Sequence, residues 1–220
     1  MTGFPVDLTI ALTGVTHAQL ANWRRTGLLV PEVSKKRPPL YSFRDLVALR
    51  TVAWLRTNTS LQKVRRAFAQ LGEFDLTDHP AAYEFAVGGG SIAVWTDAGF
   101  MDLVKNPGQY QFYTLADVFR PFNNRNDEMI VDFQKPRPTL SVDARKLGGW
   151  PTIDGTRVPF DIVADALSGD LPLSSDQVQA FYPGVSPNAA HRAPGSRYSP
   201  SDHVTSLSVS SRDNMRGGQM

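Results

Sequence analysis

The sequence of 220 residues predicts an α+β protein with a helical head, a small β-rich middle block and a small helical C-terminal unit. Three observations support this prediction. Capped amphipathic helices fill the first 71 residues, β-rich runs separated by glycines follow, and two short helical stretches come after residue 160. The expected regions are 1–74, 75–133, 134–186 and a disordered tail of Ser, Pro, Gly and Arg at 187–220.

The head contains a short helix with clear start and stop signals. Thr16 is followed three positions later by Gln19, the capping-box pair that satisfies backbone amides at a helix start. The helix spacing buries Leu20 and Trp23, and Gly27 is placed to end the helix. Further amphipathic helices are predicted at 43–56 and 60–71. The expected core residues are Val15, Leu20, Trp23, Leu28, Leu46 and Leu49.

Charge is divided unevenly along the chain. Residues 1–71 hold eleven Lys or Arg and three acidic residues, a net charge of +8. The rest of the chain holds twelve basic and eighteen acidic residues, a net charge of −6. A basic head with helix-turn-helix order predicts contact with DNA phosphates. The alternative is that these basic side chains only keep the helix surfaces in contact with solvent and bind nothing.

Candidate DNA contacts lie on the predicted helix 16–26 and on the basic loop after it. Asn and Gln suit the edge of adenine, and an imidazole can reach a base or a phosphate. The candidates for base edges are His17, Gln19 and Asn22. The candidates for phosphate binding are Arg24, Arg25, Lys35, Lys36, Arg37 and Tyr41. For each phosphate-binding candidate the alternative is structural: the charged side chains only face solvent, and the Tyr41 ring only packs in the core.

The middle block has the pattern of a small sheet. Runs at 83–87 and 91–95 flank three glycines and predict a hairpin, 101–104 and 110–113 are further strand candidates, and 115–122 is a helix candidate capped by Thr114. No P-loop lysine follows the glycines. Apolar periodicity stops near Leu71, so no long heptad helix is expected. The sheet edge is the candidate for a homodimer contact, and completion of a monomer core is the alternative.

Several functional classes are not expected. Without cysteine the chain has no disulfide and no thiolate centre. The histidines lack metal-ligand spacing, and no carboxylate constellation suggests catalysis. Asp154 and Asp161 lie near Arg157, which predicts a local ion pair or a turn-capping role. We therefore expect no enzyme, no metal and no cofactor. No apolar run approaches the roughly 20 residues of a membrane span, so a cytoplasmic protein is expected.

Four motifs in the head resemble the MerR-like winged helix. They are 12–16 (LTGVT), 25–31 (RTGLLVP), 40–46 (LYSFRDL) and 60–64 (SLQKV). The resemblance implies that helix 16–26 enters the major groove and that loop 32–41 forms a wing against the sugar-phosphate backbone. The family commonly has basic residues where this chain has Ala18 and Ala21, and often an arginine where Pro39 stands. The resemblance therefore implies no base preference.

Residues 131–185 are similar to the domain of unknown function 433, a small helix-turn-helix-like unit, through the motifs 153–159 (IDGTRVP) and 181–185 (FYPGV). After 186–190 the family would continue a helix, whereas this chain continues to Ala193-Pro194-Gly195. A MerR-like head joined to such a domain resembles a VapB-type antitoxin. That resemblance implies repression at operator DNA and neutralisation of a PIN-like ribonuclease toxin. The alternatives are a stand-alone MerR-like regulator and a protein-binding adaptor that does not bind DNA.

The active site of a PIN-like ribonuclease is a cluster of carboxylates that binds Mg²⁺, so a cation is the expected inhibitor group. The candidate toxin-binding residues are Arg157, Arg192 and Arg197. For the tail, the alternative is a terminus with no role in binding.

Overall fold

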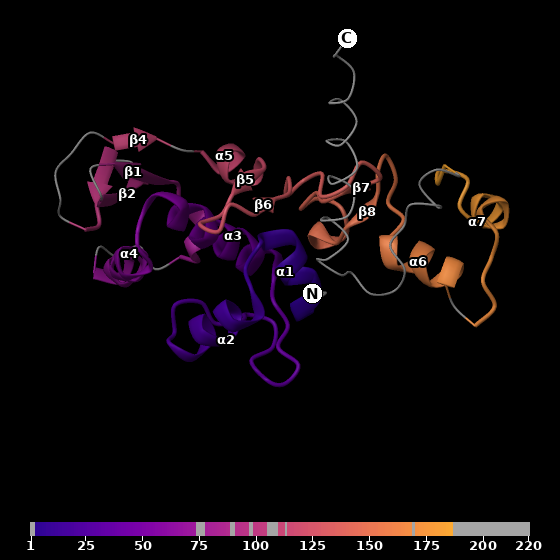
Figure 1. Cartoon of the computed structure of the whole chain (residues 1–220), viewed down its shortest axis with the longest axis horizontal. Coiled ribbons are helices and arrows are strands. Elements are labelled where there is room, and N and C mark those ends of the chain that lie inside the picture. Colours follow the sequence, from indigo (N-terminus) through magenta and orange to yellow (C-terminus); the bar gives the residue numbers. More distant parts are fainter. Residues whose placement is uncertain are drawn as a thin grey trace, which may run out of the picture.

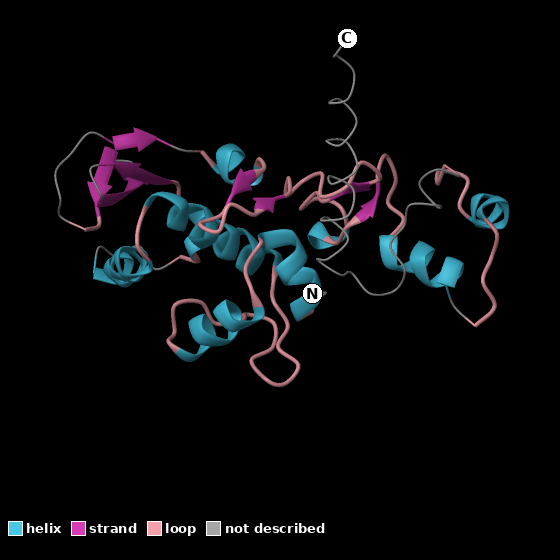
Figure 2. Cartoon of the chain, in the orientation of Figure 1, coloured by secondary structure: helices cyan, strands magenta, loops and turns pink. Residues whose placement is uncertain are grey.

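The computed structural model describes residues 3–73, 78–88, 91–96, 99–104, 110–112, 114–168 and 170–186. A four-stranded sheet lies at one end, the helices of the head lie at the centre, and a helix pair lies at the other end (Figure 1). Helices dominate the head and strands are concentrated in the middle of the chain, as Figure 2 shows. Buried apolar side chains from Phe4 to Val185 belong to one connected core. The mixed α and β class predicted from the sequence is confirmed.

Four helices form the head: α1 (Val6–Thr13), α2 (His17–Arg25), α3 (Phe43–Asn58) and α4 (Leu61–Glu73). The predicted helices are confirmed, and five of the six predicted core residues are buried, with Leu28 packed against them. Helix α1 was not predicted from the sequence. Its β-branched Thr9 and Thr13 are unusual inside a helix, but their hydroxyls donate to the carbonyls of Pro5 and Thr9, four residues earlier.

Gly14 lets α1 end and turn directly into α2. Its φ of +72° is in the left-handed region, and its N–H donates to the carbonyl of Ile10 at 2.9 Å. A Cβ at this position would lie 2.5 Å from the Ile130 side chain. Both the backbone conformation and the close packing therefore require glycine.

The middle sheet is antiparallel, with the order β3-β2-β1-β4. Its strands are β1 (Phe85–Gly88), β2 (Ser91–Thr96), β3 (Gly99–Asp102) and β4 (Tyr110–Phe112). The predicted hairpin is confirmed, because Gly88 pairs with Ser91. Strand β3 begins two residues earlier than predicted. The ring of Phe68 in α4 stacks on Phe85 at 5.4 Å, which joins the sheet to the head.

The helix expected at 115–122 is shorter than predicted. Helix α5 (Leu115–Phe119) ends because the chain turns into β5 (Phe122–Asn123), which pairs with β6 (Met129–Ile130). This hairpin was not predicted. Each of its strands is two residues long, which is too short for alternation of apolar and polar residues to be recognised.

Arg50 is fully buried at the junction of the head and the middle block. Its guanidinium donates at 2.7–3.1 Å to the carbonyls of Leu12, Val118, Phe119, Arg120 and Val131. Four of these carbonyls lie at the C-terminal ends of α1 and α5, where the helix dipole is negative. Burial lowers the pKa of Arg50 to about 10, so the group remains charged at neutral pH. Arg50 therefore adds to the count of basic residues in the head without reaching its surface.

The C-terminal unit contains two short strands, a 3-10 turn and two helices. They are β7 (Leu140–Ser141), η2 (Leu147–Gly149), β8 (Thr152–Ile153), α6 (Phe160–Ser168) and α7 (Ser175–Phe181). Both helices were predicted, and Ser174 caps α7 through the backbone N–H of Gln177.

The C-terminal unit packs directly on the head. A Cβ on Gly149, whose φ is +86°, would overlap the ring of Phe43 at the start of α3. The neighbouring Trp150 ring lies 5.4 Å from that of Phe4. The tail predicted at 187–220 lies outside the described residues, as do Arg192 and Arg197. Within the described ranges, no helix has the length and hydrophobicity needed to cross a membrane.

Candidate nucleic-acid interface

Helix α2 is fixed at its start and along its inner face. The Gln19 backbone N–H donates to Thr16 Oγ1 at 3.2 Å, and the Thr16 N–H donates to Gln19 Oε1 at 3.0 Å. This is the predicted capping box. Leu20 and Trp23 are buried beneath the helix, while Ala18 and Ala21 are exposed. The helix therefore presents a short outer face with small side chains.

The three candidates for base contacts differ in their freedom to bind. His17 is exposed, and its Nε2 lies 3.4 Å from Asp7 Oδ1. The carbonyl oxygen of Gln19 is engaged in the cap, which leaves its amide N–H groups to donate. Asn22 accepts a hydrogen bond from the Arg25 guanidinium at 2.9 Å. Asn22 therefore retains its amide N–H groups and one lone pair of its carbonyl oxygen for other partners.

The predicted wing is a bridged loop with a basic tip. Ser34 and Leu40 exchange two backbone hydrogen bonds of 3.0 Å. Lys35, Lys36 and Arg37 lie between them and are exposed. In Figure 1 this loop projects on the same side of the molecule as α2. The loop therefore presents three cations beside the helix.

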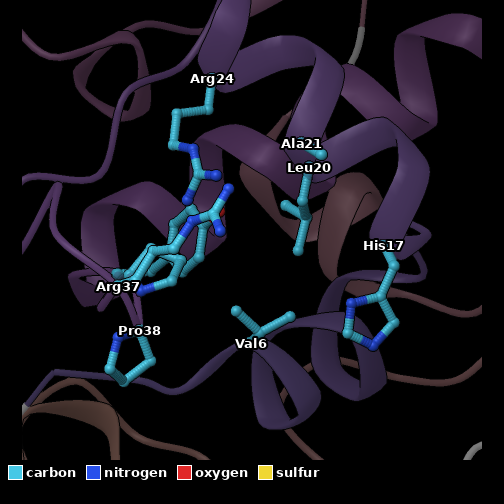
Figure 3. A pocket seen from close by; sticks show the side chains of 9 residues that line it. Val6, His17, Leu20, Ala21, Arg24, Arg37 and Pro38 are labelled. Atoms are coloured by element: carbon cyan, nitrogen blue, oxygen red, sulfur yellow. The ribbon is translucent and has the colours of Figure 1, made fainter.

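A groove of about 520 Å³ lies between α2, the start of α1 and the wing. Its lining residues are Val6, His17, Leu20, Ala21, Arg24, Arg37, Pro38, Pro39 and Tyr41. In Figure 3 the side chains of Arg24 and Arg37 extend toward the same wall of the groove. Neither guanidinium pairs with a carboxylate among the residues that the structure describes. The groove thus combines apolar walls with two free cations.

Tyr41 forms part of the inner wall of this groove and is almost fully buried. Burial raises the pKa of the Tyr41 phenol, and the nearby Arg24 charge opposes that rise. The phenol is therefore neutral at physiological pH.

A hydrogen-bonded clamp closes the base of the wing. Asp45 is buried, and its Oδ2 accepts from the backbone N–H groups of Glu32 at 2.9 Å and Ser42 at 2.8 Å. The Glu32 carboxylate accepts from the Ser42 hydroxyl at 2.6 Å and from Arg44 at 2.7 Å. Since Glu32 and Ser42 stand at the two ends of the wing, Asp45 fixes both ends at once.

His79 meets this clamp from outside the head. Oxygen or nitrogen atoms of Glu32, Asp45 and His79 lie within 4.8 Å of one another, a donor set of the type that binds cations. Both oxygens of Asp45 and both ring nitrogens of His79 already have hydrogen-bond partners. Hydrogen bonding therefore accounts for this arrangement. Nothing in the sequence pattern pointed to it, because 34 residues separate Asp45 from His79.

Further cations that were not singled out from the sequence extend the basic surface behind α2. Arg65 of α4 donates to the Thr26 hydroxyl at 3.4 Å, and the Arg56 guanidinium lies 5.9 Å from the centre of the Trp23 rings. Burial, and then the charge of Arg125, lowers the pKa of Arg56. Helical spacing on α3 and α4 was the available signal for these residues.

Of the two roles predicted for Asp154 and Asp161, the ion pair with Arg157 is not found among the described residues. Asp154 instead pairs with Lys135 at 2.7 Å, and Asp161 accepts from the Trp150 indole N–H at 3.0 Å. The Lys135 ammonium lowers the pKa of Asp154. Arg157 is exposed in the turn before α6, with no carboxylate partner among the described residues. The two other candidate toxin-binding residues cannot be placed, because they lie outside the described ranges.

Comparison with known proteins finds matches to two segments of the chain. Residues 9–71 match the family model described as MerR HTH family regulatory protein, and residues 140–194 match that described as protein of unknown function (DUF433). No curated protein matches the chain. Among solved structures, the chain is similar to the X-ray crystal structure of Rv2018 from Mycobacterium tuberculosis, with a TM-score of 0.50 and 20% identity over 87% of this chain and 99% of that chain. That likeness shows a shared fold. The two family matches identify the head as a MerR-family helix-turn-helix domain and the C-terminal unit as a DUF433 domain.

Proposed function

We propose that this protein is a DNA-binding autorepressor that recognises its operator through α2 and the wing. The observation that carries this proposal is the groove between these two elements, with its free Arg24 and Arg37 guanidinium groups. A phosphate of the DNA backbone fits between two such cations and can be bound by both. The exposed basic tip of the wing continues the same positive surface.

The proposed binding mode assigns different tasks to the two elements. Helix α2 enters the major groove, where the small Ala18 and Ala21 permit close approach and Asn22 and His17 reach base edges. The wing tip contacts phosphates, which sets the position of the helix without reading sequence. With few long side chains on α2, base recognition depends on a small number of contacts.

Selection of duplexes from a random library by the full chain tests this proposal. We expect an enriched sequence, and we expect Asn22→Ala to relax the preference at one base pair by about 1–3 kcal/mol. A protein that enriches no sequence, or an Asn22→Ala variant that selects the same sequence with the same strength, would contradict the assignment of α2.

The enriched site also tests assembly. We propose a homodimer formed through an outer strand of the middle sheet, since α4 ends at Glu73 and is too short for a heptad dimer helix. A dimer requires an inverted repeat with half-sites about one helical turn apart. Light scattering on the full chain should give twice the monomer mass. A monomer bound to a single half-site would contradict the dimer.

We also propose that the protein is an antitoxin that neutralises a PIN-like ribonuclease and has no catalytic activity of its own. The stretch from Val158 to Ser186 of the DUF433 domain supports a protein-binding role, because it contains four Asp and no Lys or Arg. Such a surface is unsuited to DNA. The exposed Arg157 at its edge is the candidate for insertion among the carboxylates of the ribonuclease.

Inhibition of any PIN-like ribonuclease encoded beside this gene tests the antitoxin role. We expect the full chain to abolish RNA cleavage and Arg157→Ala to weaken inhibition. A version ending at Val185 separates the folded domain from the tail that holds Arg192 and Arg197. A chain that binds its operator but inhibits no neighbouring ribonuclease would be a stand-alone regulator.

A further inference from the structure

His79 lies at the start of η1 (Pro80–Ala82), the short turn that leads from the head into the middle sheet. Its side chain is 12% exposed. The backbone N–H of Ala81 donates to His79 Nδ1 at 3.2 Å, so Nδ1 is the acceptor nitrogen of a neutral ring. The hydrogen is then on Nε2, which donates to Asp45 Oδ1 at 3.2 Å.

The acceptor of this hydrogen bond is the residue that holds the wing. Asp45 is fully buried, and its other oxygen binds the backbone amides at both ends of the wing. Among the described residues, His79 is the one hydrogen-bond partner of Oδ1. A buried carboxylate that loses a partner must find another or admit water, because an unsatisfied buried charge is costly. The orientation of Asp45, and with it the base of the wing, therefore depends on His79.

We propose that His79 is a positioning residue for the wing, and that it couples the middle sheet to DNA affinity. η1 can move when a strand pairs with the sheet or when a partner binds there. Such a movement changes the hydrogen bond from His79 to Asp45. The wing ends at Glu32 and Ser42 then loosen together, and the basic tip loses its fixed place beside α2. The part of this inference that concerns DNA affinity rests on the proposed function.

Comparison of two variants of the full chain isolates this hydrogen bond, because both lose the Nδ1 acceptor of the Ala81 N–H and they differ in the donor to Asp45. His79→Leu removes the donor and keeps a side chain of similar size. His79→Gln restores a donor, because its terminal amide N–H reaches about as far as Nε2 of the imidazole. Tyr83→Phe is the matched control. It removes the hydroxyl that accepts from the Asp78 N–H at 2.8 Å, so it alters the same segment without touching Asp45.

Trypsin provides a readout that does not require DNA, because Lys35, Lys36 and Arg37 form the wing tip. We expect His79→Leu to increase the rate of cleavage at the tip and to weaken DNA binding about tenfold, the loss expected for one hydrogen bond to a charged group. We expect His79→Gln to recover both properties and Tyr83→Phe to retain both. Urea unfolding of each variant separates local loosening from general loss of stability.

The outcomes are distinguishable. Wild-type tip cleavage in His79→Leu, or equal loss in His79→Gln and His79→Leu, would overturn the positioning role. If the wild-type chain binds no DNA, the proposed function fails, while the cleavage rates still decide whether His79 holds the wing.

Discussion

The head and the DUF433 domain use the same local structure for different surfaces. Helix α2 begins with the capping box of Thr16 and Gln19, and α7 begins with that of Ser174 and Gln177. Both follow another helix after a short connection. Yet α2 ends in two arginines, and α7 has no basic residue. Arrangement of helices alone therefore does not indicate DNA binding. The side chains on the outer face carry that information.

Exposed groups in the two units strengthen the contrast. In the head they are the cations of α2 and the wing tip. In the DUF433 domain, Leu171 is 89% exposed and Phe181 is 68% exposed, among acidic neighbours such as Asp170 and Asp176. The first surface is suited to phosphate and the second to protein. The cationic surface and the acidic surface thus belong to two different units that share one core (Figure 1).

The largest expected effect comes from breaking that shared core at Arg50. Arg50→Met leaves several buried carbonyls at the ends of α1 and α5 without a donor, so the free energy of unfolding should fall by roughly 3–5 kcal/mol. Arg120→Ala is the control, since its exposed pair with Asp117 should contribute less than about 1 kcal/mol. Urea unfolding measures both. Equal stability of the two variants would mean that the head does not depend on the middle block.

A smaller effect is expected when the acidic surface is neutralised. Asp165 lies in α6, Asp176 lies in α7 and Asp170 lies in the connection between them, and this helix pair lies to one side of α2 and the wing (Figure 1). Charges act over roughly 8 Å in physiological salt. Changing all three to Asn should alter DNA affinity by less than about twofold. Fluorescence anisotropy with a labelled duplex measures this. A tenfold gain would place the DUF433 domain against DNA and remove the contrast between the two units.

The smallest expected effect concerns acid. Hydrogen bonds from Thr114 lower the pKa of Asp117, and the Lys135 ammonium lowers that of Asp154. Since their unfolded values are about 4, the unfolded chain takes up protons first as the pH falls. The contribution of these carboxylates to the free energy of unfolding is therefore present above pH about 4 and is lost below it. Urea unfolding between pH 6 and 3 should show this decline, with a shallower slope after Asp117→Asn and Asp154→Asn together.

Local signals explain which parts of the fold could be predicted. The capping box at Thr16, the glycines between β1 and β2 and the spacing on α3 are properties of neighbouring residues. The predictions based on them are confirmed. Helix α1 was missed because Thr9 and Thr13 obscured the helical pattern, although Gly14 marked its end.

Long-range contacts explain the rest. Arg50 appears in the sequence as one more cation of a basic head, and only the folded chain brings α5 and residue 131 to it. The same holds for His79, which lies 34 positions from Asp45. The apolar walls of the groove, formed by Val6 and the wing prolines, also come from separate segments. Pattern and composition carry no signal for such pairs.

The salt dependence of DNA binding tests the central claim, that the head binds phosphate through α2 and the wing. The logarithm of affinity should fall linearly with the logarithm of salt concentration, with a slope of about 0.9 for each phosphate contact. Changing Lys35, Lys36 and Arg37 to Ala should weaken binding to all sequences and flatten the slope by up to about 2.7, corresponding to three lost contacts. A triple variant with the wild-type slope would contradict the claim and exclude the wing from the DNA interface.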